Sequence, residues 1–137
     1  MIKGFTVKSS NRKSEGIPKR ILIVEDDRDM QEYYEYIFRN ERKRYVVDVV
    51  GDPVSAMGQL KEKTYDLFIV DIIMERMPGD VFIANIKKDR RTKEIPVLVV
   101  SVLEPDMLEE LTKKKRVYFL PKPITKRQLL SKMRELL

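Results

Sequence analysis

The sequence predicts an α/β fold, a doubly wound, five-stranded parallel sheet of the flavodoxin-like (βα)5 type with strand order 2-1-3-4-5. Apolar runs of strand length alternate five times with segments whose apolar residues recur at helical spacing. This alternation is typical of a parallel sheet with helices on both faces. Crossovers between parallel strands are right-handed, which favours the doubly wound order with the first and third strands as neighbours.

The strands follow from short runs rich in Val, Ile and Leu, such as Ile21-Leu22-Ile23-Val24. Runs that are apolar throughout indicate strands buried on both faces. We expect the five strands near residues 20–25, 45–50, 66–71, 96–101 and 117–120.

The first two helices are marked by apolar spacing and by acidic residues at their starts. Asp27 and Asp29 are expected as favourable charges in the first turn of the first helix, although a minor role for Asp27 beside a metal stays open. Asp52 and Pro53 have the character of a cap and a first helical residue. The apolar faces of these two helices are Met30, Tyr33, Tyr34, Ile37 and Phe38, then Ala56, Met57 and Leu60.

The other three helices are predicted in the same way. Asp80 is expected to cap the third helix, and the fourth opens near Pro105. A polar run, residues 113–116, follows the fourth helix, and the fifth ends the sequence. The apolar faces are Phe82, Ile83 and Ile86, then Leu108 and Leu111, then Leu129, Leu130, Met133, Leu136 and Leu137.

Composition indicates one domain and excludes several chemistries. The 137 residues are 42% hydrophobic, enough to fill the core of one domain. Cysteine and histidine are absent, which excludes disulfides, thiolate zinc sites, cysteine nucleophiles and histidine-dependent triads. No apolar stretch approaches the ~20 residues that span a bilayer, and the first residues lack the apolar core of a signal peptide. We therefore expect a cytoplasmic protein without membrane attachment.

The net charge of +6 is concentrated at the amino terminus. Residues 1–20 contain six basic side chains and one acidic side chain, whereas the remaining 117 residues contain 22 and 21. We expect residues 1–19 to be a flexible basic tail and residues 20–137 to be the domain. A basic tail is most often a solubilising extension, so nucleic-acid binding is expected to be at most weak and through this tail.

Polar side chains stand at the ends of four of the predicted strands. Glu25 and Asp26 follow the first strand, Asp71 the third, Ser101 the fourth and Lys122 the fifth. Each residue alone is more often a solvated turn residue or a helix cap. Together they meet at the carboxyl edge of one sheet, where neighbouring carboxylates would repel each other unless a cation lay between them. Hard oxygen ligands of this kind suit Mg²⁺.

These residues resemble the receiver domain of response regulators, the phosphoacceptor module of two-component signalling. In that family an acidic pair follows the first strand, an aspartate ends the third, Ser or Thr ends the fourth, and Lys-Pro follows the fifth. Asp71 follows Asp26 by 45 residues, Ser101 follows Asp71 by 30, and Lys122 follows Ser101 by 21, and similar separations are usual in the family. The resemblance spans roughly residues 20–137. No single residue makes it specific; its specificity comes from finding all of these residues in this order.

The resemblance implies how the site would work. Asp71 would take a phosphoryl group from a phosphohistidine of a sensor histidine kinase or a histidine phosphotransfer protein. Asp26, Asp71 and the backbone carbonyl of Ile73 would bind Mg²⁺ directly, and Glu25 would reach it through a water. Lys122 and Ser101 would contact the phosphoryl oxygens.

The family also implies a switch and an output. Movement of Ser101 would be coupled to Phe119, changing the face built from the fourth helix, fifth strand and fifth helix, where a downstream target protein or a second copy would bind. Phe119 could equally be plain core, while Tyr118 should point to the opposite face of the strand. The basic run 113–116, with Lys126 and Arg127, is either a solvated face or a surface for an acidic partner.

Three positions depart from the family pattern. Glu75 replaces the usual proline, while Met77 and Gly79 keep their places after Pro78. Ile73 is larger and less polar than residues often found at its position, and Val102 replaces a small residue. Our hypothesis is that Ile73 and Val102 slow exchange at the acyl phosphate and lengthen its lifetime.

Other functions remain as alternatives. The principal one is a degenerate receiver that docks partners without taking phosphate. A phosphatase of the haloacid dehalogenase type would need a second aspartate where Ile73 stands, and FMN binding would need a Ser/Thr/Gly-rich loop where Glu25 and Asp26 stand. Because the sequence ends with the fifth helix, we expect a single-domain, non-enzymatic regulator that acts by docking.

Overall fold

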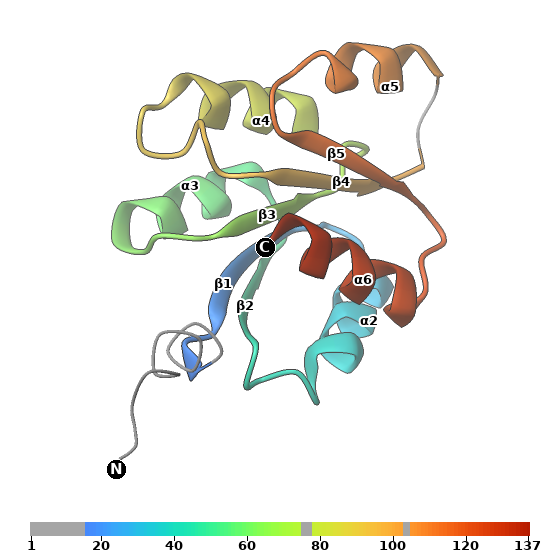
Figure 1. The fold of residues 1–137 in the computed structure, drawn as a ribbon. Coiled ribbons are helices and arrows are strands. Elements are labelled where there is room, and N and C mark those ends of the chain that lie inside the picture. Colours follow the sequence, from blue (N-terminus) through green and yellow to red (C-terminus); the bar gives the residue numbers. More distant parts are fainter. Residues whose placement is uncertain (1–15, 75–77, 103–104) are drawn as a thin grey trace.

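A five-stranded parallel sheet with strand order β2-β1-β3-β4-β5 forms the centre of the molecule. The structure is a computed structural model that describes residues 16–74, 78–102 and 105–137. The strands are β1 (Lys19–Val24), β2 (Tyr45–Val50), β3 (Leu67–Val70), β4 (Val97–Ser101) and β5 (Val117–Pro121). The helices are α2 (Arg28–Phe38), α3 (Pro53–Glu62), α4 (Gly79–Lys88), α5 (Pro105–Thr112) and α6 (Lys126–Leu136). The predicted strand order and (βα)5 architecture are confirmed, and Figure 1 shows the elements.

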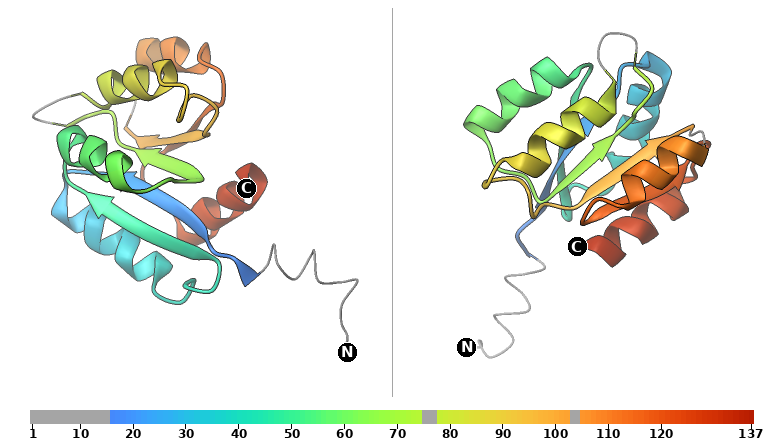
Figure 2. Two further views of the ribbon diagram at one scale, coloured as in Figure 1. Left: turned by 90° about the vertical axis from the view of Figure 1, so that its left-hand side faces the viewer. Right: turned by 90° about the horizontal axis from the view of Figure 1, so that it is seen from above.

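Helices cover both faces of the sheet, with α2 and α6 on one face and α3, α4 and α5 on the other (Figures 1 and 2). Successive strand residues face opposite layers. Leu22 and Val24 pack with α3 and α4, whereas Ile21 and Ile23 pack with α2 and α6. Both faces of the central strands are therefore buried, which explains their continuous apolar sequences.

Strand β5 shows the same alternation. Phe119 packs against the α3–α4–α5 layer, and Tyr118 packs against the α2–α6 layer. The prediction that these neighbours point to opposite sides is confirmed. The strand therefore contacts both layers of the domain.

The start of α3 matches the sequence prediction, whereas the prediction that Asp27 lies in the first turn of α2 was wrong. Asp52 accepts a hydrogen bond from the Ser55 amide (2.7 Å), and Pro53 is the first residue of α3. Asp27 is itself the cap of α2, where it accepts from the Met30 amide (3.0 Å), and only Asp29 lies in the first turn.

Two further helix predictions were wrong. Asp80 does not cap α4, because the Gly79 amide already donates to the Ile72 carbonyl (2.9 Å) and the helix begins at Gly79. Asp80 instead supplies a negative charge in the first turn. Met57 is 37% exposed, because one residue beyond buried Ala56 the helix has turned it towards solvent.

None of the helices in the described part of the chain has the length and apolar character needed to cross a bilayer. The expectations for Glu75 and Met77 fall outside the described residues.

Candidate functional site

Side chains from the ends of four strands meet at the carboxyl edge of the sheet. Glu25 follows β1 and Asp71 follows β3, and both side chains are buried although they are acidic (1% and 6% exposed). The parallel register holds them together, because the Asp71 amide donates to the Val24 carbonyl (3.0 Å). The site thus brings together two carboxylates that are distant in sequence.

Asp71 is held by three donors. The Ser101 hydroxyl donates to Asp71 Oδ1 (2.6 Å), and the Ile73 amide donates to the same oxygen (3.1 Å). The Lys122 ammonium donates to Asp71 Oδ2 (3.0 Å). Ser101 is fully buried at the end of β4, and its hydroxyl also lies 3.4 Å from the Val102 carbonyl.

Lys122 bridges the two buried carboxylates, since its ammonium also donates to Glu25 Oε1 (2.9 Å). Burial alone would lower the pKa of Lys122, but the hydrogen bonds to Glu25 and Asp71 outweigh it and the pKa lies above its ordinary value. The Lys122 amide donates to the Ser101 carbonyl (3.1 Å), so the two strand ends are joined. Lys122 is therefore a charged group shared by both acids.

Glu25 has an environment that disfavours its charge. Burial raises the pKa of its carboxyl to about 7, and Asp71 adds to the rise, while hydrogen bonds from Lys122 and the Asp27 amide oppose it. The main cause of the raised pKa is therefore burial, to which the surplus of negative charge from the neighbouring Asp71 carboxylate adds.

A divalent cation would relieve that surplus. Glu25, exposed Asp26 and Asp71 each place one carboxylate oxygen so that the three atoms lie within 4.8 Å of one another. Three hard oxygen donors around one point fit Mg²⁺ by ligand type. The residues present therefore fit the group that the resemblance implies.

Gly79 and Gln31 support the site, and sequence reasoning missed their roles. A Cβ atom at Gly79 would overlap the Asp71 carbonyl oxygen and lie 2.9 Å from the Ile72 Cα, so only glycine allows the start of α4 to approach this closely. The Gln31 side-chain amide (Nε2) donates to the Glu25 backbone carbonyl (2.6 Å). The Pro-Gly pair that marks a turn at Gly79 was visible in the sequence, but the close approach to Asp71 was not.

The rim of the site is apolar. Ile73 is 54% exposed and Val102 is 63% exposed. A recess of about 450 Å³ beside Lys122 is lined by Met30, Tyr33, Val102, Lys122, Pro123 and Ile124. An apolar surface thus adjoins the polar centre.

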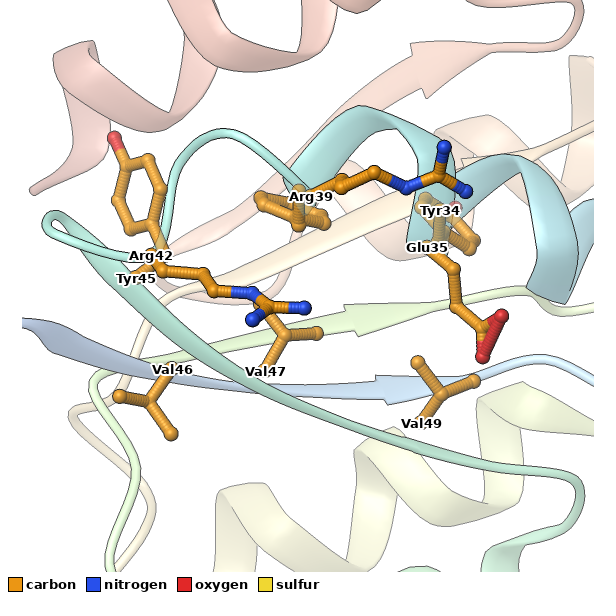
Figure 3. Close-up of a pocket in the computed structure, with 9 residues that line it drawn as sticks. Tyr34, Glu35, Arg39, Arg42, Tyr45, Val46, Val47 and Val49 are labelled. Carbon is orange, nitrogen blue, oxygen red and sulfur yellow. The ribbon is translucent and has the colours of Figure 1, made fainter.

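A larger groove, of about 700 Å³, lies elsewhere, between α2 and the edge strand β2 (Figure 3). Its floor includes Val47 and Val49, and Arg39 and Arg42 lie beside it with Glu35. Among its lining residues this groove has one carboxylate and none of the predicted site residues. The candidate functional site is therefore the cluster at the strand ends.

The chain belongs to the response regulator receiver domain family, whose model matches residues 21–134. It is thus the receiver domain of a two-component response regulator, a class that generally binds Mg²⁺ at an acidic cluster and interacts with sensor histidine kinases and downstream effectors.

Individual relatives agree with this assignment. A protein-glutamate methylesterase/protein-glutamine glutaminase of Bradyrhizobium diazoefficiens is 31% identical over 107 residues, 76% of this chain and 29% of that protein. The receiver domain of a Syntrophus aciditrophicus signal transduction histidine kinase has a TM-score of 0.75 and 27% identity, covering 86% of this chain and 89% of that one. The chemotaxis response regulator CheY4 of Vibrio cholerae has the same fold (TM-score 0.79, 20% identity, 88% and 100% covered).

The chain spans between about a fifth and three tenths of the length of the curated relatives it matches. The esterase activity named for those relatives therefore belongs to proteins that are much longer than the matching segment.

Proposed function

We propose that Asp71 accepts a phosphoryl group from the phosphohistidine of a sensor histidine kinase or a histidine phosphotransfer protein. The observation that carries the proposal is the environment of its two oxygens, with Ser101 at 2.6 Å and Lys122 at 3.0 Å. A carboxylate oxygen of Asp71 attacks phosphorus, and the bond from phosphorus to the imidazole nitrogen breaks with the electron pair remaining on nitrogen.

This chain's own residues prepare that step. Lys122 neutralises charge on one phosphoryl oxygen, and the Ser101 hydroxyl turns from Asp71 to donate to another. Glu25, Asp26, Asp71 and the Ile73 carbonyl would hold Mg²⁺, which, when bound, reduces repulsion between the carboxylate and the incoming oxygens. The apolar recess beside Lys122 supports docking of the donor protein next to the site.

The phosphoryl group would switch the face formed by α5, β5 and α6, which is the face expected from the fourth helix, fifth strand and fifth helix. Ser101 and Lys122 are joined through the backbone at the ends of β4 and β5. Displacement of Ser101 would reach Phe119, which packs against the layer containing α5. A downstream protein or a second copy of the chain would read the altered face as the output of a non-enzymatic regulator.

We further propose that the receiver unit is residues 20–137, with a basic tail at 1–19, and that it acts in the cytoplasm. The family match over 21–134 supports the boundary, and β1 begins at Lys19, one residue before it.

Incubation with Mg²⁺ and acetyl phosphate, followed by intact-mass measurement, tests the phosphoacceptor. We expect a phosphate-sized gain in the native chain and in Asp106→Asn, a matched change of an exposed acid in the first turn of α5. Asp71→Asn and the chelator-treated chain should show none. A chain that gains no phosphate and binds no Mg²⁺ would contradict the proposal and favour the degenerate, phosphate-independent docking module.

A further inference from the structure

A dense group of basic side chains lies at the end of the sheet opposite the carboxylates. The turn after α4 and the turn after α5 meet at that end (Figure 1). Residues 87–94 and 113–116, which we call the basic corner, contain nine basic and two acidic side chains. The rest of residues 21–137 contains 13 basic and 19 acidic side chains. The domain is therefore nearly neutral as a whole, but its positive charge is concentrated in the basic corner and the rest of it is net negative.

The two turns of the basic corner form one surface. Lys115 Nζ lies 3.9 Å from Glu94 Oε2, and the Val97 amide donates to the Arg116 carbonyl (2.9 Å). Burial lowers the pKa of Lys87, and the positive charge of Arg116 on the other turn lowers it further, while Glu94 opposes the change. The cations of both turns therefore lie on one continuous surface, where a single ligand can contact them together.

The first turn is rigid, which distinguishes it from a freely solvated charge run. Lys87 donates to the Lys93 carbonyl (3.1 Å) and to the Ile95 carbonyl (3.0 Å). The buried Thr92 hydroxyl donates to the Ile86 carbonyl (2.7 Å). A surface held in place before binding loses less conformational entropy when a ligand arrives.

The chemistry of the basic corner decides its ligand. Both of its acids are already engaged, Asp89 with Arg91 (3.2 Å) and Glu94 with Lys115. No large exposed apolar residue lies among the basic corner's described residues, and its sequence has no aromatic side chain. Protein interfaces are usually centred on apolar or aromatic anchors, and single-stranded nucleic acids are held by stacking. A surface of cations alone suits a regular array of phosphates.

We propose that the basic corner binds the phosphate backbone of double-stranded nucleic acid without reading its sequence. The ligand would be held by exposed cations of both turns, chiefly Lys88, Arg90, Lys93, Lys114 and Arg116. Binding at this end leaves the Asp71 end of the sheet open to solvent. This site is separate from the basic tail, for which the sequence predicts at most weak nucleic-acid binding.

Fluorescence anisotropy of a labelled random-sequence DNA duplex, titrated with the full chain at several salt concentrations, tests the proposal. The Arg90→Gln/Lys114→Gln variant removes two charges from the basic corner. The Arg28→Gln/Arg127→Gln variant removes the same charge from two exposed residues outside it and is the matched control. Both variants retain the basic tail, so its contribution is constant.

The slope of log affinity against log salt is negative, and we expect its magnitude to decrease by about 0.9 for each phosphate that the basic-corner variant no longer neutralises. The control should show little change. Affinity in 0.1 M salt should fall about tenfold or more in the basic-corner variant alone. Equal reductions in the two variants would assign binding to the tail or to net charge and overturn the proposal. Binding of polyglutamate or anionic lipid vesicles as tight as that of DNA, and equally reduced in the basic-corner variant, would also overturn it in favour of an acidic protein or a membrane surface.

Discussion

The ammonium of Lys122 lies 2.9 Å from Glu25 Oε1 and 3.0 Å from Asp71 Oδ2, so one cation serves two buried carboxylates. Replacement by methionine would keep the apolar stem and remove the charge. We expect Lys122→Met to lower the free energy of unfolding by about 3 kcal/mol, because an uncompensated buried charge is left behind.

Urea unfolding in chelator measures this decrease, and added Mg²⁺ should recover part of it by replacing the missing positive charge. Lys63→Met is the matched control, because that lysine is 39% exposed where it pairs with Asp48 and should contribute less than about 1 kcal/mol. Equal decreases in the two variants would contradict the bridging role.

The Ser101 hydroxyl is expected to act in phosphoryl transfer more than in stability. Ser101→Ala should slow uptake of phosphate from acetyl phosphate by about 100-fold, because one donor to the transferring group is removed. Stability should fall by only about 1 kcal/mol. Ser101→Thr retains the hydroxyl and should restore most of the rate, so an inactive threonine variant would count against the hydroxyl as the active element.

Gly79 is expected to be intolerant of any side chain. A Cβ atom there would overlap the Asp71 carbonyl, so Gly79→Ala must shift α4 or the site and should cost about 2 kcal/mol. Gly58, within α3, has open space around it, and Gly58→Ala should stabilise by up to about 1 kcal/mol. Thermal unfolding of the two variants, with and without Mg²⁺, separates damage to the site from the loss of glycine flexibility. Similar changes in stability for Gly79→Ala and Gly58→Ala would refute the close approach of α4 to Asp71.

The exposed apolar pair Ile73 and Val102 is predicted to protect the acyl phosphate from water. Val102→Ala and Ile73→Asn should each shorten the lifetime of phosphorylated Asp71 several-fold, because both side chains stand at the rim of the site. The decay of the phosphorylated mass after removal of acetyl phosphate measures this directly. Lifetimes unchanged in both variants would dismiss the shielding hypothesis.

Acid should weaken a second polar cluster, away from the site. Asp48 accepts hydrogen bonds from the Tyr65 hydroxyl (2.6 Å) and from Lys63 (3.2 Å). Burial alone would raise the pKa of Asp48, but these hydrogen bonds outweigh it and hold the pKa below its ordinary 3.8. The unfolded chain therefore binds the proton more readily, and the stabilisation, about 1 kcal/mol, is complete only well above pH 3.8 and is lost as the pH falls through the folded pKa.

Unfolding free energies measured between pH 7 and pH 2.5 test this dependence. The difference between the native chain and Asp48→Asn should be constant above about pH 5 and shrink below it. A difference that grows on acidification would reverse the sign and refute the assignment.

Most of the fold was accessible from the sequence because buried parallel strands leave continuous apolar runs. Glu25, Asp71, Ser101 and Lys122 were found for a related reason, since parallel strands deliver their ends to one edge. The close approach of Gly79 to Asp71 could not be found this way, because it depends on how closely α4 packs against another turn. Met57 was misplaced because adjacent residues of a short helix share similar apolar character.

The charge pattern shows another limit of sequence reasoning. Summed over residues 21–137 the domain is almost neutral. The sum hides the basic corner, since turns after different helices come together only when the sheet forms. Net charge reports solubility, whereas the position of each charge depends on topology.

The pairing of β4 with β5 runs from Val97 opposite Val117 to Ser101 opposite Pro121. One strand pair therefore connects the basic corner with Ser101, over a length of about 13 Å. That length exceeds the screening distance of about 8 Å in physiological salt, so charges exposed to solvent at the two ends interact only weakly. A coupling between the two ends that is carried by movement of β4 and β5 would depend little on added salt.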